Sequence, residues 1–501
     1  MFKIEDTPEE DSSAFDIISS GLNKGVFQLE SNLAISHSKR FKPKNSEEVT
    51  NLISIIRPGS LPLAPVYLRR LLGDEAVSYI DDRLEPILKD TQGIILFQEQ
   101  ILKIVQDLAG YSGVESDILR RQIGKKKEDE LKRDLPKLRQ AFVDNGMEED
   151  SADQLVQEIS YSSSYGFNKS HARSYARLAI ITAFFKSNYS IVFFWANLKM
   201  AYNKQDSLEE VRDLFYDAKK FDIDIIPPSL KDINDDFEII GDNKIAFGFR
   251  SVKGLGDSGI KQLYRYKNAD TWHKFLIQSI DKKIKKQVVE ALIRCGAVDY
   301  FGETRSFMLG EYEIARTLSA KQAEVFVEIH SELAKVEDTI SLISIKNKRL
   351  RIGKDTKRVL EEIKGSDSRD LSIKLELWER FYFGIPLITS RIEEFSDQDI
   401  THSIGEINKC PAGDICIIGI LESASVIKSR KDNKEMAFLK ISDRTGQLDG
   451  IVVFSDLYTN CFYNRNILKR PENEVLKIKA FKKIDEVRGE SIIAKSIDIL
   501  G

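Results

Sequence analysis

The period of the hydrophobic pattern changes once along the chain, after Pro411. Before it, apolar residues recur mostly at helical spacing, as in residues 94–108, where the stripe stops at the helix breaker Gly110. After it, short apolar or alternating runs lie at residues 415–421, 436–441, 448–454 and 475–480. Five or so short strands with long connections favour an OB-type barrel over a sandwich. The sequence therefore predicts a multidomain, mainly α-helical chain with a C-terminal all-β OB-type barrel.

Charge limits the kind of nucleic-acid contact that the chain can make. Its 501 residues contain 75 Lys and Arg against 79 Asp and Glu, a net charge of -4. This balance excludes a uniformly basic coat, so any contact with phosphate must come from local basic patches. At roughly 150 residues per domain, the length predicts about three domains.

Four cysteines without a C-x-x-C pair are typical of reduced thiols in a cytosolic protein. The acidic N-terminus shows no export signal. The most apolar stretch, residues 178–200, is interrupted by polar side chains, which favours two buried helices meeting at a turn over a membrane span. We therefore expect a cytoplasmic protein without a membrane partner.

Two basic segments are candidate phosphate-binding sites. The first puts five cations within eight residues, namely Arg120, Arg121, Lys125, Lys126 and Lys127. Arginine forks bind phosphate oxygens bidentately and lysine acts as a point charge, although the acidic residues 128–130 leave a solvated helix face as the alternative. The second is Lys253-Gly254-Leu255-Gly256, which has the form of a helix-hairpin-helix turn. Its glycines let backbone N–H groups approach a phosphate, so the segment predicts DNA binding without sequence reading.

Four stretches in a fixed order resemble the large subunit of the bacterial replicative DNA polymerase III, a C-family polymerase. They comprise residues 25–31 with 56–59, residues 97–100 with 119–127, residues 166–176, and residues 253–256 with 291–299. Each stretch alone is a weak signal, whereas their order and spacing together are specific. The segment before residue 25 is similar to the stretch that follows the palm in that family.

The resemblance implies a domain order of fingers (1–215), a helix-hairpin-helix domain for DNA or clamp binding (216–310), a helical connector (311–404) and an OB fold (405–501). It implies that the triphosphate of the incoming nucleotide contacts Arg57, Arg120, Arg121, Lys125, Lys126, Lys127, Lys169 and His171. No general-base role is expected for His171, because no orienting partner is visible. With Asn168 and Lys169, it should organise the fingers or contact the DNA backbone.

The resemblance also implies DNA contacts in the C-terminal half. The expected residues are Lys253, Gly254, Gly256, Lys282, Lys283, Lys285, Lys286, Lys428, Arg430 and Lys431. The last three belong to a basic loop beside the barrel, a track for single-stranded template if the barrel is more than a packing domain. Between the two regions, Gln322-Ala323-Glu324-Val325-Phe326 matches the form of a sliding-clamp anchor. Gln322, Val325 and Phe326 would make the contact, and a buried helical core is the alternative.

In this family, three palm aspartates hold the two metal ions of nucleotide addition, and they precede the segment that matches residues 25–31. The residues before Gly25 include Asp6, Asp11 and Asp16. They do not form the Asp-x-Asp pattern on a β-strand that the palm requires. We therefore expect no catalytic residue, metal site or cofactor in this chain, with Mg²⁺ in the palm of a partner chain, and no activity alone.

Three hypotheses follow: a naturally split polymerase with a palm-bearing partner, a non-catalytic regulator that binds DNA or the clamp, and a fragment of a longer polymerase. Departures from the family pattern, such as Ser229 after the proline pair, are those expected of divergent members in phages or mobile elements.

Overall fold

A computed structural model describes residues 3–124, 128–163, 166–201, 203–204, 206–266, 269–330, 354–356, 358–359, 371–388, 390–395, 398–429, 433–463, 474–485 and 489–500. The chain divides into two compact units. Unit 1 comprises Met1–Phe193 with Ile484–Glu490, and unit 2 comprises Phe194–Lys483 with Ser491–Gly501.

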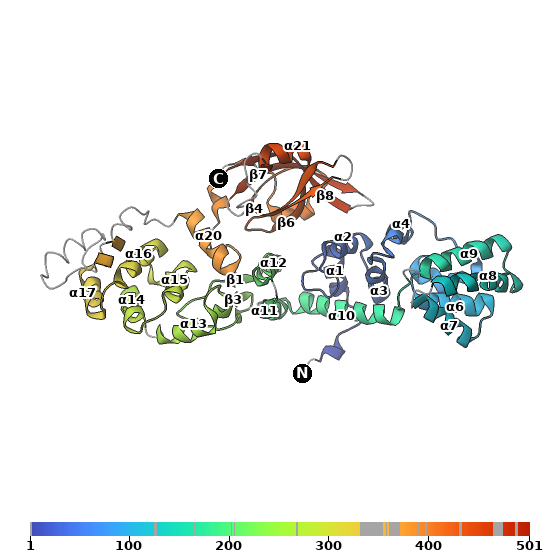
Figure 1. Ribbon diagram of the computed structural model, residues 1–501, viewed down its shortest axis with the longest axis horizontal. Helices are drawn as coiled ribbons and strands as arrows, with labels where there is room; N and C mark the ends of the chain where they lie inside the picture. Colours follow the sequence, from blue (N-terminus) through green and yellow to red (C-terminus); the bar gives the residue numbers. More distant parts are fainter. Residues whose placement is uncertain are drawn as a thin grey trace. The chain divides into compact units, whose positions relative to one another are not determined.

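Unit 1 is helical and is organised along the 20-residue helix α10 (Lys169–Asn188). Helices α1 (Ser12–Ser20) and α3 (Ser46–Ile55) pack on α10, and α2 (Asn32–Phe41) and α4 (Ala64–Leu72) adjoin them (Figure 1). A second bundle shares its own apolar core, which includes Ile104, Leu108, Phe142 and Leu155. Its members are α5 (Glu85–Leu88), α6 (Gln98–Ala109), α7 (Gly113–Gly124), α8 (Glu128–Asp144) and α9 (Glu149–Ser163).

Short polar residues define where several of these helices begin. The side chains of Asp11, Ser31, Asn45 and Asn168 each accept the backbone N–H three residues further on, which satisfies a donor that the helix itself cannot pair. Helix α6 ends where Gly110 takes φ 70°, a left-handed conformation that glycine adopts without a steric penalty. Local sequence therefore sets the helix ends that position α10.

The two helices expected in residues 178–200 are confirmed as α10 and α11 (Ser190–Ala201). In the part of the chain that the structure describes, no single helix is long and apolar enough to span a membrane. Helices α10 and α11 pass that test only as a pair, and they are bent by 116° at their junction.

Unit 2 begins with α12 (Ser207–Lys219) and a small sheet in the order β1-β3-β2, formed by β1 (Asp224–Ile226), β2 (Glu238–Gly241) and β3 (Lys244–Ala246). A short 3-10 turn at Phe249–Ser251 then leads into a group of helices. These are α13 (Gly256–Leu263), α14 (Trp272–Asp281), α15 (Lys286–Arg294), α16 (Arg305–Ala315) and α17 (Ala320–His330) (Figure 1).

The C-terminal part of unit 2 is a closed five-stranded barrel in the order β4-β5-β6-β8-β7, which confirms the expected OB-type fold. Its strands are β4 (Gly413–Lys428), β5 (Glu435–Ser442), β6 (Gln447–Val453), β7 (Val475–Asp485) and β8 (Gly489–Ile499), with the short helix α21 (Ser455–Tyr458) after β6. Alternate strand residues such as Ile417, Leu439 and Ile478 fill the interior.

A buried ion network fastens the barrel to two helices of the same unit. The pairing of β4 with β5 shifts register between Leu421 and Ser423, so that Glu422 stands in the irregularity. Its carboxylate pairs with Arg380 of α20 (Ser372–Phe383) at 2.7 Å and with Arg212 of α12 at 3.1 Å. Burial raises the pKa of Glu422, but the two guanidinium groups outweigh it, so the pKa lies below its usual value. The carboxylate is therefore charged and paired.

Candidate phosphate-binding sites

In unit 1, two of the motifs expected from the sequence lie side by side. Phe97 and Phe167 form a parallel bridge, in which Gln98 N donates to Phe167 O at 2.9 Å and Phe167 N donates to Leu96 O at 3.2 Å. Helices α6 and α10 both begin directly after this bridge, so their N-terminal ends are neighbours. Two adjacent helix N-termini bring two positive dipole ends into one region.

Arg57 lies in this region, and its positive charge can bind an anion. Its guanidinium carbon stands 3.6 Å from the centroid of the Phe167 ring. Burial lowers the pKa of Arg57, but a guanidinium remains charged at neutral pH. Among the described residues, no carboxylate forms an ion pair with it. A stacked, pre-oriented guanidinium without a counter-charge is suited to bind an anion such as phosphate.

His171 contacts the same aromatic group. It is exposed, and its ring centroid lies 5.4 Å from that of Phe167 and 4.1 Å from that of Tyr175. Phe27, from the first motif, makes an edge contact with Tyr175 at 5.1 Å. The folded chain thus brings together Arg57, His171 and the three motifs around residues 27, 97 and 167.

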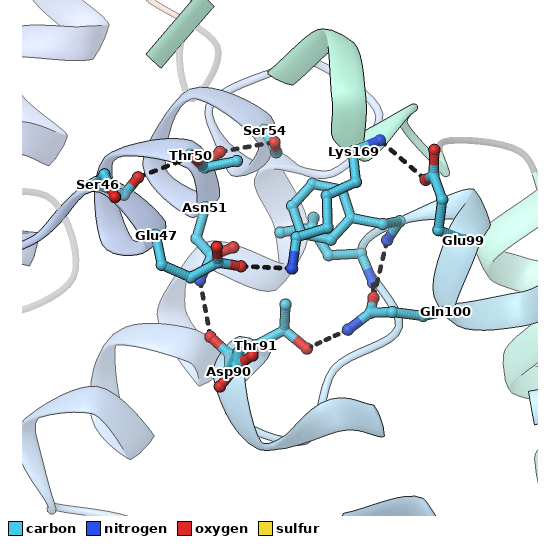
Figure 2. A network of polar contacts seen from close by, with 12 residues as sticks. Ser46, Glu47, Thr50, Asn51, Ser54, Asp90, Thr91, Glu99, Gln100 and Lys169 are labelled. Atoms are coloured by element: carbon cyan, nitrogen blue, oxygen red, sulfur yellow. Dashed lines mark hydrogen bonds and ion pairs between the residues drawn. The ribbon is translucent and has the colours of Figure 1, made fainter. Parts of the chain in front are cut away.

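Lys169 belongs to the same region, but its charge is already paired. Its ammonium group lies 2.6 Å from Glu47 Oε1 and 5.5 Å from the centroid of Phe97, and its backbone N–H donates to Glu99 (Figure 2). The surrounding network continues from Asn51 to the Asp90 carbonyl and from Gln100 to Thr91 (Figure 2). A phosphate would have to compete with Glu47 for this ammonium group.

The structure describes the cation-rich run at residues 120–127 only in part. Arg121 lies on α7 with 66% of its side chain exposed, and it pairs with Asp117 at 2.9 Å. Such an exposed (i, i+4) pair is weak and leaves the guanidinium accessible. The side chain of Arg120 and residues Lys125, Lys126 and Lys127 lie outside the described residues. Their role in binding triphosphate stays a prediction.

In unit 2, the turn at Lys253-Gly254-Leu255-Gly256 has the backbone geometry expected of a hairpin. Gly254 and Gly256 take φ values of 89° and 53°, and α13 begins at Gly256. Lys253 is exposed, with its ammonium group 4.4 Å from the centroid of Phe381, and its backbone N–H donates to the Tyr382 carbonyl at 3.0 Å. Helix α20 therefore packs against this hairpin.

A second hairpin connects α14 to α15 through Lys282, Lys283, Ile284 and Lys285. Lys283 takes φ 49°, while Ile284 is buried and anchors the turn. Lys285 N donates to Gln262 Oε1 of α13 at 3.1 Å. A Cβ atom on Gly254 would lie 3.0 Å from Gln287 Nε2 of α15. These contacts make the two hairpins direct neighbours.

The lysines of the two hairpins divide into two groups. Lys282 donates to the Arg265 carbonyl at 2.5 Å and to Gln278, and Lys286 pairs with Glu313 at 2.8 Å and with Glu290. All five lysines are exposed, but Lys253, Lys283 and Lys285 form no ion pair with a carboxylate within the described ranges. Helix α15 also begins with two lysines and no capping side chain. Of these two, Lys286 is already paired with Glu313 and Glu290, so only the positive charge of Lys285 at this helix N-terminus lacks a carboxylate partner among the described residues.

The remaining candidate residues lie further along unit 2. Lys428 is exposed at the end of β4, opposite Glu435 of β5, while Arg430 and Lys431 lie outside the described residues. No group of three or more His, Cys, Asp or Glu side chains in the described ranges is placed to hold a metal ion.

The proposed clamp motif lies on α17, where Phe326 is only 1% exposed. Gln322 Oε1 accepts from the backbone and the hydroxyl of Ser319, which closes the start of the helix, and α17 packs on α14. Val325 is half-buried. These contacts favour the helical-core alternative that the sequence left open, and clamp binding by this segment stays a prediction.

Several contacts that shape these sites were not predicted from the sequence, although Asn168 itself was expected to organise the fingers. Glu99 and Asn168 hydrogen bond across 69 positions of sequence, and Gln262 and Gln287 join the two hairpins. Asn168 carries a usable signal, since Asn directly before a helical run predicts an N-cap. The others carry none, because their partners are distant in sequence.

Comparison with known proteins agrees with this arrangement. Residues 1–150 match the bacterial DNA polymerase III alpha subunit finger domain, and residues 222–308 match a helix-hairpin-helix motif. The chain is 34% identical over 326 residues to the DNA polymerase III subunit alpha of Aquifex aeolicus, covering 64% of this chain and 28% of the relative. It is 30% identical over 473 residues to that of Thermus aquaticus (90% and 36%) and 28% identical over 445 residues to that of Bacillus subtilis (88% and 38%).

The chain thus spans about a third of the length of the curated relatives that it matches. The two family matches fall on the two regions where the candidate sites lie, the first on the fingers and the second on the paired hairpins. The chain belongs to the family of bacterial DNA polymerase III alpha subunits, of which it carries the finger and helix-hairpin-helix regions.

Proposed function

We propose that this chain holds primer–template DNA and positions the incoming nucleotide for a replicative DNA polymerase. The observation that carries the proposal is the pair of adjacent hairpins in unit 2, on which Lys253, Lys283 and Lys285 are exposed and form no ion pair with a carboxylate of the described residues. The family membership supports the same conclusion, since the relatives are named as DNA polymerase subunits.

The hairpin chemistry suits the sugar–phosphate backbone. The positive φ values of Gly254 and Gly256 expose the backbone at the start of α13, where N–H groups and the helix dipole favour an anion. Lysine ammonium groups add charge without reading base edges. Binding of this kind is indifferent to sequence and is driven largely by counterion release.

For the nucleotide, we propose that Arg57 and His171 contact the triphosphate at the start of α10. Arg57 is the stronger candidate because it is stacked and without a counter-charge among the described residues. Arg120, Arg121 and Lys125 to Lys127 would add further cations from α7 and the run after it. Lys428, Arg430 and Lys431 would guide single-stranded template beside the barrel.

We assign binding and positioning, rather than bond formation, to this chain. In the family that the chain resembles, the aspartates that hold the metal ions for nucleotide addition belong to a palm segment. That segment would come from a partner chain or from the same longer polypeptide. A clamp and a palm-bearing chain are therefore the proposed protein partners. Mixing the chain with a palm-bearing chain, and assaying primer extension, distinguishes a polymerase component from a non-catalytic regulator.

The DNA-holding role is tested by replacing the three unpaired lysines together. Lys253→Gln, Lys283→Gln and Lys285→Gln in one variant should weaken duplex binding at ~0.1 M salt and reduce the salt slope by about three, because each phosphate contact contributes about one. Fluorescence anisotropy of a labelled duplex measures both quantities.

The matched control removes the same charge from exposed lysines elsewhere in unit 2, with Lys204→Gln, Lys244→Gln and Lys274→Gln. It should keep the wild-type affinity and slope within error, apart from a small general charge effect. Equal losses in the two triple variants would contradict a localised site and leave only nonspecific attraction.

A further inference from the structure

Glu99 is the second residue of α6 and has no role in the proposed site. Its carboxylate accepts from two donors at the start of α10. Oε1 accepts from Asn168 Nδ2 at 2.7 Å. Oε2 accepts from the Lys169 backbone N–H at 2.8 Å (Figure 2). One side chain thus fills the N-terminal end of a helix that begins 70 residues later in the sequence.

These bonds determine the orientation of the Asn168 side-chain amide. Its Nδ2 donates to Glu99, so its Oδ1 is directed to the His171 backbone N–H, which donates to it at 2.8 Å. The same short loop contains Phe167, on which Arg57 stacks. Glu99 therefore fixes the backbone that carries both His171 and the aromatic platform of Arg57.

Glu47 offers a contrast at the same lysine. It pairs with the Lys169 ammonium group at 2.6 Å and makes no bond to the helix start, whereas Glu99 bonds to the Lys169 backbone (Figure 2). Removal of Glu47 takes away one negative charge of the region and leaves the cap intact. The two glutamates separate electrostatic effects from positioning.

We infer that Glu99 is a positioning residue for the triphosphate site, acting through Asn168 and the α10 N-terminus on Arg57 and His171. This inference rests on the proposed nucleotide-binding function. It predicts that disturbing the Glu99–Asn168 bond weakens binding of a triphosphate even though Glu99 itself is an anion that does not contact the ligand.

The test reverses the donor and acceptor of this bond in the full chain. Glu99→Gln faces the Asn168 donor with a second donor, and Asn168→Asp faces the Glu99 carboxylate with a second carboxylate. In the double variant, the Gln amide donates to the Asp carboxylate, its oxygen accepts from the Lys169 N–H, and Asp still caps His171. The probe is a fluorescent dATP analogue, with inorganic tripolyphosphate as a competitor without a base.

Each single variant should weaken binding roughly threefold to tenfold, the range of one net hydrogen bond, and the double variant should return to within about twofold of wild type. Glu47→Gln should keep or strengthen binding, because it releases the Lys169 charge. A merely structural bond would lower the melting temperature without changing affinity in the folded chain, so melting curves are recorded for every variant.

The inference would be overturned if both single variants bound the triphosphate with wild-type affinity. It would also be overturned if the loss of affinity in the double variant equalled the combined losses of the two single variants. Arg57→Gln, with Arg69→Gln as its control, separates this failure from failure of the site. If Arg57→Gln weakens binding about tenfold and the Glu99 variants do not, only the role of Glu99 is rejected. If Arg57→Gln binds as wild type, the nucleotide site itself is wrong, and the inference falls with it.

Discussion

At the scale of single residues, the sequence offered candidate cations but not which of them the fold pairs with a carboxylate. Lys169, Lys282, Lys285 and Lys286 are equivalent in a sequence pattern, yet the fold pairs Lys169 with Glu47 and Lys286 with Glu313. Lys285 has no such counter-charge within the described ranges. The difference depends on carboxylates brought close by tertiary folding, and local charge patterning does not contain that information.

Glu311 illustrates a residue whose behaviour follows only from burial. It lies on α16 and accepts a hydrogen bond from Trp272 Nε1 of α14. Burial raises its pKa to about 7, although the bond from Trp272 acts in the opposite direction. The folded chain thus keeps this proton at a pH where the unfolded chain has lost it. Stability is therefore highest below the unfolded-state pKa and falls as the pH rises to about 7.

Replacing Glu311 by Gln should remove this pH dependence. Between pH 5 and pH 8, the free energy of unfolding of the wild type should fall by roughly 2 kcal/mol relative to Glu311→Gln, because burial raises the pKa of Glu311 to about 7. Urea titrations of both proteins at several pH values measure the difference. A constant difference across that range would show that the carboxyl group titrates normally.

At the scale of elements, the sequence predicted which segments form helices and strands better than it predicted the residues at which they begin and end. The apolar stripe of residues 94–108 suggested one helix, but α6 begins only at Gln98. Gln100 Oε1 accepts from the backbone N–H groups of Leu96 and Phe97, which holds the preceding residues extended for the bridge to Phe167. In the barrel, β8 was not located, since the consecutive Ile492 and Ile493 interrupt the alternation that marks a strand.

Helix α17 is the element where two interpretations of the same residues can be separated. As core, Phe326→Ala should cost about 3–5 kcal/mol of stability, and Gln322→Ala about 1 kcal/mol through the lost cap, whereas Lys321→Ala on the exposed face should cost little. Thermal melts of the three variants and a clamp-binding assay provide the readout. Unchanged melting together with lost clamp binding would instead identify this segment as the clamp anchor.

At the scale of the whole molecule, the order of regions could be predicted from spaced motifs, because fingers, hairpins and barrel each leave a separate local signature. The finger match lies at residues 1–150, the helix-hairpin-helix match lies at residues 222–308 and the closed barrel begins at Gly413, whereas the expected domain boundaries stay predictions. The assembly within each unit could not be predicted. The buried pairs of Glu422 with Arg380 and Arg212, and the meeting of the two hairpins through Gln262 and Gln287, depend on long-range packing.

The central claim is that the paired hairpins hold duplex DNA through its phosphates. A salt titration of duplex binding by the wild-type full chain tests it most directly, with two duplexes of unrelated sequence and equal length. The logarithm of the binding constant should fall linearly with the logarithm of salt concentration, with a slope of about -3 or steeper for at least three neutralised phosphates, and the two duplexes should coincide. A flat titration, or a clear preference for one sequence, would contradict the account.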